Sequence, residues 1–187
     1  MASVKQKLAA IKMLFDWLVT GQILPVNPAA AVRGPKHVVT VGRTPVLTAE
    51  EARKLLDAID TSTIAGKRDR ALIATMLYTF ARIGAVTSMD VEDYESRGRR
   101  MWINLREKGG RRHAVPAHHT LEEYLDDYVS AAELSHETKF PLFRSLDRKR
   151  QLTTRRIHRR EVLAMVKRRA RDADLPESFH SPVCRSW

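Results

Sequence analysis

The chain contains one cysteine, Cys184, among its 187 residues. A single thiol cannot form an internal disulfide or a cysteine-based metal cluster, and a chain without disulfides suits a reducing compartment, so we expect a cytoplasmic location. No segment approaches the roughly 18 consecutive apolar residues that a membrane span requires. The amphipathic N-terminal segment also lacks the apolar core of a signal peptide. These absences argue against a disulfide scaffold and against a membrane protein.

Glycine and proline are scarce as well, at eight residues each, while 43% of the residues are hydrophobic. This composition allows a buried core, and the length fits one domain, or one domain with a remnant of another. Four of the prolines fall within residues 25–45 and indicate a break between two parts of the chain. We expect a helical remnant at residues 1–32, a linker at 33–47 and the main domain at 48–187.

Acidic residues are nearly absent from residues 148–171. That segment has eleven lysines and arginines against one acid, Glu161, which is a net charge of +10, whereas the rest of the chain holds 22 basic and 21 acidic residues. A solvated helix face usually interleaves acids with its bases. A charge this concentrated favours a polyanion partner whose phosphates it neutralises, and we expect double-stranded DNA. The DNA-binding candidates are Arg155, Arg156, Arg159, Arg160, Lys167, Arg168 and Arg169.

The pattern of apolar residues predicts a mainly α-helical chain with one small antiparallel β-sheet, an α+β class. Helices are predicted over residues 4–20, 70–82 and 154–172, and Thr-to-Glu capping boxes at 48–51 and 120–123 predict the starts of two more. Ser3 and Gly21 are expected to cap the first helix. Two strands are predicted at 101–105 and 113–116, joined by a turn at 107–110.

Two motifs, and the order of the elements around them, resemble the tyrosine recombinases of the phage integrase family. Residues 79–86 (Thr-Phe-Ala-Arg-Ile-Gly-Ala-Val) are similar to the family's T-G-x-R-x-x-E turn and match it at Arg82, with Phe80 in place of the glycine and Ala85 in place of the glutamate. Residues 107–116 (Glu-Lys-Gly-Gly-Arg-Arg-His-Ala-Val-Pro) resemble the family's hairpin motif G-K-G-x-x-R-x-V-P. A helix, a Pro-Leu-Phe connector and a basic helix then follow in the family's order.

The resemblance implies a recombinase catalytic domain over residues 48–187, preceded by the last helix of the family's core-binding domain and by the interdomain linker. Members of the family break and rejoin DNA strands. Guanidinium groups suit the charge that gathers on a phosphate under attack, and by the resemblance Arg82 is such a clamp. Lys108 corresponds to the family's general acid, which protonates the departing 5′-oxygen. No cofactor is implied, and the sequence contains no metal motif such as His-Glu-x-x-His.

The family's last motif is H-x-x-R, followed by a second His or Trp and then by the tyrosine nucleophile. Arg185 corresponds to the arginine, but Pro182 stands where the family has histidine, and His180 could replace it only with a changed spacing. All tyrosines precede the basic helix and are expected in the core; they are Tyr78, Tyr94, Tyr124 and Tyr128. We therefore expect a C-terminally truncated recombinase, also lacking most of its core-binding domain, that is inactive alone because the nucleophile is absent.

Two other classes stay open at this point. One is a non-catalytic DNA-binding module that occupies recombination sites, and the other is a basic RNA-associated protein. The set of Arg82, Lys108 and Arg185 favours the recombinase and the DNA-binding module over the RNA-associated protein, because an RNA binder needs no such set. The apolar stripe of the first helix lacks its usual partners and predicts self-association, or association with a full-length recombinase.

Overall fold

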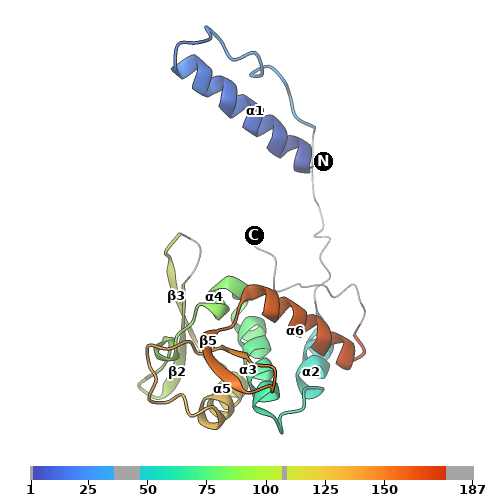
Figure 1. Cartoon of the computed structure of the whole chain (residues 1–187), viewed down its shortest axis with the longest axis vertical. Coiled ribbons are helices and arrows are strands. Elements are labelled where there is room, and N and C mark those ends of the chain that lie inside the picture. Colours follow the sequence, from blue (N-terminus) through green and yellow to red (C-terminus); the bar gives the residue numbers. More distant parts are fainter. Residues whose placement is uncertain (1, 36–46, 107–108, 176–187) are drawn as a thin grey trace. The chain divides into compact units, whose positions relative to one another are not determined.

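The structure, a computed structural model, describes residues 2–35, 47–106 and 109–175. It divides into two compact units, Met1–Arg43 and Thr44–Trp187. The chain is mainly helical with small antiparallel sheets (Figure 1), so the predicted fold class is confirmed. None of the helices in the described ranges combines the length and the apolar character needed to cross a membrane.

The first unit consists of one helix, α1 (Ala2–Thr20), and an irregular segment that returns along it. The Asn27 side-chain amide donates to the Lys12 carbonyl at 3.1 Å and to Asp16 Oδ1 at 2.6 Å, which ties this segment to the helix. Much of the apolar surface of α1 stays exposed; it includes Val4, Ile11, Met13, Leu14 and Trp17. A single helix with one returning segment is too small to bury a two-sided apolar surface.

The predicted helix at residues 4–20 is confirmed, but its predicted capping residues are not. Ser3 lies inside the helix, because the helix already begins at Ala2. At the other end the left-handed residue is Gln22, with φ 57°, and not Gly21. The Ile23 amide then donates to the Leu18 carbonyl at 2.9 Å, a bond that closes the last turn.

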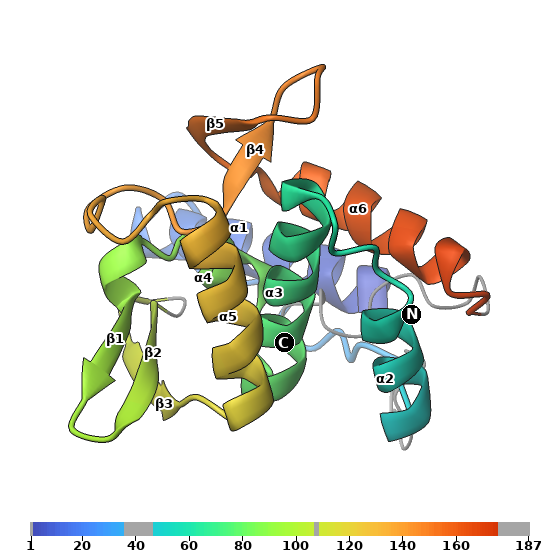
Figure 2. The same cartoon turned by 90° about the horizontal axis from the view of Figure 1, so that it is seen from below.

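Helix α3 (Ile64–Thr79) runs through the middle of the second unit, with α5 packed on one side and α2 on the other (Figure 2). The other helices are α2 (Ala49–Asp57), α4 (Ile83–Thr87), the short 3-10 helix η1 (Val91–Asp93), α5 (His119–Ala131) and α6 (Arg159–Asp172). The interior of α3 is buried nearly all round, from Ala71 to Met76. It is therefore the central element against which the others bury their apolar faces.

The two predicted capping boxes have different outcomes. At α2 the Glu51 amide donates to Thr48 Oγ1 at 3.2 Å and the Thr48 amide donates to Glu51 Oε2 at 2.8 Å, so this box is confirmed. At α5 the capping residue is His118, whose Nδ1 accepts from the Thr120 amide at 3.3 Å. Thr120 lies inside α5 and is not its cap. The helix begins earlier because a histidine lone pair replaces the expected hydroxyl.

A three-stranded antiparallel sheet contains the predicted hairpin. Strands β2 (Arg100–Arg106) and β3 (Arg112–Pro116) pair as predicted, and β1 (Tyr94–Arg97) adds an edge strand that the sequence pattern did not predict. Ile103 and Leu105 of β2 point inward and are buried. The opposite face of β2 therefore carries the alternate residues into solvent.

The predicted helix over residues 154–172 is correct only from Arg159 onward. Strands β4 (Arg144–Leu146) and β5 (Leu152–Arg156) form a second antiparallel hairpin, and α6 begins only at Arg159. The hydroxyls of Ser145 and Thr153 lie 2.8 Å apart across this pair. His158 Nδ1 accepts from the Arg160 amide at 3.2 Å and caps α6. The apolar spacing alone predicted one continuous helix. The β-branched residues of β5 and the histidine cap instead make the helix begin at Arg159.

Helix α3 ends at Thr79, three residues before the predicted end, and the next residue has an unusual conformation. Phe80 is left-handed, with φ 53°, and the residue is 91% exposed. A left-handed residue with a Cβ atom is strained, and glycine is the usual choice at such a position. Phe80 therefore carries strain that its own burial does not offset.

We predict that Phe80→Gly raises the free energy of unfolding by about 0.5–1 kcal/mol. The change removes a left-handed penalty of roughly 1–2 kcal/mol and adds an unfolded-state entropy cost of roughly 0.5–1 kcal/mol. Phe80→Ala is the control, because it retains a Cβ atom and should give no comparable gain. Denaturant titration of the three proteins measures the difference. Equal stability of the glycine and alanine variants would contradict the assignment of strain to Phe80.

Candidate nucleic-acid interface

Arg82 is placed at the start of α4. It is the N-cap residue of that helix, and its carbonyl accepts from the Ala85 amide at 2.8 Å and from the Val86 amide at 3.2 Å. Its chain neighbours Ala81 and Ile83 are both buried, whereas Arg82 itself is half-buried. Helix α4 contacts both α6 and β2. The backbone that carries the Arg82 guanidinium is thus held between the basic helix and the sheet.

The β2–β3 hairpin rises from the body of the second unit (Figure 1). Lys108, the predicted general acid, lies outside the described residues. Gly109 and Gly110 follow it with φ values of 84° and 77°, a conformation that glycine adopts without strain. The last residues paired across the hairpin are Arg106 and Arg112. Guanidinium groups therefore flank the turn on both strands.

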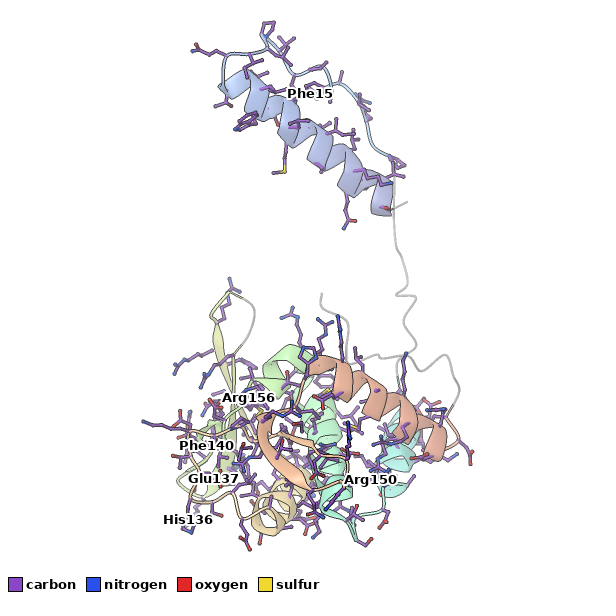
Figure 3. The ribbon with its side chains drawn as sticks, in the orientation of Figure 1. Phe15, His136, Glu137, Phe140, Arg150 and Arg156 are labelled. Atoms are coloured by element: carbon purple, nitrogen blue, oxygen red, sulfur yellow. The ribbon has the colours of Figure 1, made fainter. Side chains whose placement is uncertain are left out.

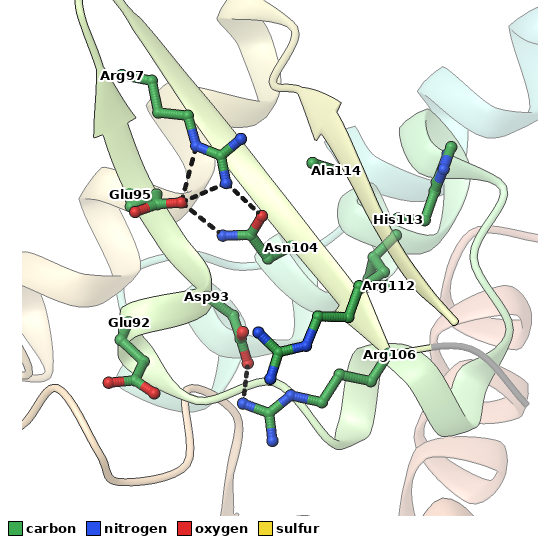
Figure 4. A pocket seen from close by; sticks show the side chains of 10 residues that line it. Glu92, Asp93, Glu95, Arg97, Asn104, Arg106, Arg112, His113 and Ala114 are labelled. Carbon is green, nitrogen blue, oxygen red and sulfur yellow. Dashed lines mark hydrogen bonds and ion pairs between the residues drawn. The ribbon is translucent and has the colours of Figure 1, made fainter. Parts of the chain in front are cut away.

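The solvent-facing side of this sheet lines an open cavity of about 490 Å³ (Figure 4). At one end Arg97 donates to Glu95 Oε1 through Nε at 2.8 Å and Nη2 at 2.5 Å, and Asn104 Nδ2 donates to the same oxygen at 2.8 Å. The hydrogen bonds from Asn104 and then from Arg97 lower the pKa of Glu95. At the other end Arg106 reaches toward Asp93, with Arg112 beside it (Figure 4). This cavity mixes both signs of charge and is not a purely basic groove.

Two of the predicted DNA-binding arginines meet a buried carboxylate; the Arg169 side chain is mostly buried, whereas that of Arg168 stays 43% exposed. Asp69 of α3 is fully buried, and its Oδ2 accepts from Arg168 Nη2 at 3.2 Å and from Arg169 Nε and Nη2 at 3.1 and 2.8 Å. Its Oδ1 accepts from Arg68 Nε and Nη2 at 3.0 and 2.5 Å. Arg68 also donates to the Arg144 carbonyl at 2.9 Å. This Asp69 cluster (Arg68, Asp69, Arg168, Arg169) joins α6 and β4 to α3.

A third predicted DNA-binding arginine, Arg156, also makes internal contacts. Its Nη1 donates to the Thr87 and Met89 carbonyls at 3.0 and 2.8 Å, and its Nη2 forms an ion pair with Asp90. Asp90 also pairs with Arg106 at 3.5 Å. These contacts connect the end of β5 to the end of α4 and to β2.

The other bases of the segment 148–171 are exposed, as Arg156 is, but they differ from it in their contacts. They lie in the β4–β5 turn, where Arg150 is seen in Figure 3, at the end of β5 and along α6. Within the described residues none of them forms an ion pair; they are Arg148, Lys149, Arg150, Arg155, Arg159, Arg160, Lys167 and Arg171. The structure therefore divides the predicted DNA-binding set into an internal group and an outward group. Arg155, Arg159, Arg160 and Lys167 belong to the outward group.

The predicted catalytic residues near the C-terminus, His180 and Arg185, lie outside the described residues. No group of three His, Cys, Asp or Glu side chains within the described ranges is arranged to hold a metal ion. The residues that sequence reasoning missed are Asp69, Asp90, Arg68 and Arg106. One signal was present for Asp69, which is an acid at the start of an otherwise apolar helical stretch.

The tyrosines of the chain are engaged in packing and hydrogen bonds. Tyr128 is fully buried and donates to the Leu142 carbonyl at 2.9 Å, and burial raises its pKa to about 12. Tyr94 lies on the unpredicted strand β1; its pKa is raised by burial and by its hydrogen bond to Asp126. Burial also raises the pKa of Tyr124, which lies under the Arg70 guanidinium. The fourth, Tyr78, stacks on a histidine ring, that of His118.

The chain is similar in sequence to known recombinases. The phage integrase family profile matches residues 45–187. The tyrosine recombinase XerC of Myxococcus xanthus is 34% identical over 128 residues, which cover 66% of this chain and 41% of that protein. The XerC recombinase of Chlamydia trachomatis is 26% identical over 191 residues, covering 99% of this chain and 58% of that protein. The chain thus spans about half the length of these two relatives.

Solved structures show the same fold. A lambda integrase dimer bound to a COC′ core site superimposes with a TM-score of 0.68 at 19% identity, covering 96% of this chain and 64% of that one. At this identity the similarity establishes the fold and not the chemistry. The family profile, in contrast, matches more than half of the chain. The chain therefore belongs to the phage integrase family, the tyrosine recombinases.

Proposed function

We propose that this chain binds duplex DNA and supplies part of the phosphodiester-exchange site of a site-specific recombinase. The observation that carries the proposal is the division of the basic residues. The Asp69 and Asp90 carboxylates hold one group, while the other group is exposed on β5 and α6, close in the fold to α4, the helix that Arg82 caps. The relatives of the chain are tyrosine recombinases, and the lambda integrase neighbour is bound to a COC′ core site.

The proposed roles follow from the chemistry of phosphate. Arg82 and Arg185 present planar guanidinium groups that match phosphate oxygens bidentately and stabilise the charge that develops on them. Lys108 protonates the departing 5′-oxygen. Arg155, Arg159, Arg160 and Lys167 neutralise neighbouring phosphates of the duplex. In this proposal Arg156, Arg168 and Arg169 support the fold and do not contact DNA.

We predict that replacing Arg155, Arg159 and Arg160 by alanine weakens duplex binding and flattens its salt dependence. Each lost phosphate contact should reduce the slope of log K against log salt by about 0.9. The control replaces three exposed bases of other elements, Arg53, Lys54 and Lys139, and so removes the same charge. Fluorescence titration over a salt series measures both. An unchanged slope in the first variant, or an equal loss in the control, would contradict the proposed interface.

The same titration counts how many chains bind each duplex. The exposed apolar side chains of α1 and the dimer seen in the lambda integrase neighbour support self-association. If the chain self-associates, we expect two chains to bind each duplex.

We also propose that this 187-residue chain alone forms no covalent bond to DNA. A phosphotransfer of this kind needs a nucleophile about 3–3.5 Å from phosphorus, and a phenol is a weak nucleophile unless its pKa is lowered or an adjacent base removes its proton. Burial instead raises the pKa of Tyr94, Tyr124 and Tyr128. Tyr78 faces a groove between α2 and the start of α5, in a stack with His118.

The test is a suicide DNA substrate incubated with the purified chain and resolved on a denaturing gel. We expect no slow-migrating adduct, whereas a full-length recombinase on its own suicide substrate is the positive control. An adduct that disappears when any one of the four tyrosines is changed to phenylalanine would refute the proposal.

A further inference from the structure

The carboxylate of Asp90 lies between α4 and η1, and its two oxygens meet different elements. Oδ1 forms an ion pair with Arg156, the last residue of β5, and Oδ2 lies 3.5 Å from the guanidinium of Arg106, the last residue of β2. The Asp90 side chain is only 16% exposed. A carboxylate sheltered in this way interacts more strongly with its partners than one in open water.

Arg156 connects Asp90 to the end of α4 through several hydrogen bonds. The same guanidinium that pairs with Asp90 donates to the Thr87 and Met89 carbonyls, at the C-terminal end of α4 (Figure 3 labels Arg156). These carbonyls lie where a helix has unsatisfied acceptors and a partial negative charge, so a cation there is stabilising. Arg156 therefore fixes the far end of the helix whose first cap is Arg82.

Arg106 makes the second connection. It lies two residues before Lys108 in the sequence, and it also approaches Asp93 at 3.4 Å, as Figure 4 shows. The end of strand β2, from which the hairpin turn departs, is thereby tied to Asp90 and Asp93. The third connection is the chain itself, since only Ile157 and His158 separate Arg156 from Arg159 at the start of α6.

The end of β2, the end of β5 and the end of α4 thus converge on one acid. We propose that Asp90 is a positioning residue: through Arg156 and Arg106 it sets the spacing between Arg82, the end of β2 and the first turn of α6. This inference rests on the proposed function, because the spacing matters only if these segments meet one DNA backbone. The partner that this spacing suits is a duplex, whose phosphates repeat at a fixed distance.

An electrostatic role and a positioning role of Asp90 predict opposite effects of a substitution on DNA affinity. Asp90→Asn removes a negative charge near the basic surface, and by Coulomb attraction it should tighten DNA binding. Loss of positioning should weaken binding. The sign of the change therefore separates an electrostatic role from a positioning role. Glu92→Gln is the matched control, because it removes the charge of an exposed acid two residues away that forms no ion pair within the described residues.

The experiment is a double-mutant cycle on duplex affinity with the full chain. It compares the unmodified chain, Arg82→Ala, Asp90→Asn and the double variant. We expect Asp90→Asn to weaken binding and to reduce the effect of Arg82→Ala by about threefold or more, which is the coupling expected of linked residues. The parallel cycle with Glu92→Gln should be additive within about twofold. A general loss of stability would lower affinity without a coupling specific to Arg82.

Thermal melting confirms that each variant is folded at the temperature of the titration. If Asp90→Asn does not fold, Arg156→Lys takes its place in the cycle; it retains the positive charge but loses the guanidinium fork. An additive cycle, or tighter binding by the Asp90 or Arg156 variant, would overturn the positioning role while leaving DNA binding intact. No binding by the unmodified chain would instead overturn the proposed function, and this inference with it.

Discussion

The buried carboxylate of Asp69 is the constraint on which the arrangement of the second unit depends. An ionised group without access to water is costly unless charged partners and hydrogen bonds surround it. Three arginines do so here, one from α3 and two from α6. Because Asp69 lies on the central helix, satisfying it fixes the rotation and position of α6 against α3. Removing one partner of such a buried pair typically costs about 3–5 kcal/mol.

Because of this constraint, the arginines of α6 fall into those that pair with Asp69 and those that are exposed without an ion pair in the described residues. Arg168 and Arg169 turn toward Asp69, while Arg159 and Arg160, roughly two to three turns earlier, lie exposed beside the histidine cap. The outward bases therefore project from a surface whose orientation the inward bases determine. A phosphate-binding surface needs this kind of fixed orientation, because a charge that must first be ordered loses part of its attraction to entropy.

The sequence predicted some of the parts of the fold that depend on local chemistry, although the caps of α1 and α5 were predicted at the wrong residues. The Thr48 capping box and the hairpin around Gly109 and Gly110 need only neighbouring residues, and both are in the structure. Strand β1 was missed because its four residues become a strand only by pairing with β2. The internal role of Arg169 could not be predicted, since its partner Asp69 lies 100 residues away in the chain. A prediction from net charge treats Arg169 as available to DNA, although in the fold its charge is already paired with Asp69.

We propose that the basic residues of segment 148–171 form one group held by carboxylates and one group that faces DNA. Labelling with an arginine-specific dicarbonyl reagent, followed by mass spectrometry with and without duplex DNA, tests this claim directly. Arg155, Arg159 and Arg160 should react in the free chain and be protected by DNA, whereas Arg68 and Arg169 should react slowly in both conditions. Equal labelling of the two groups in the free chain, or protection by DNA that spares Arg155, Arg159 and Arg160, would contradict the account.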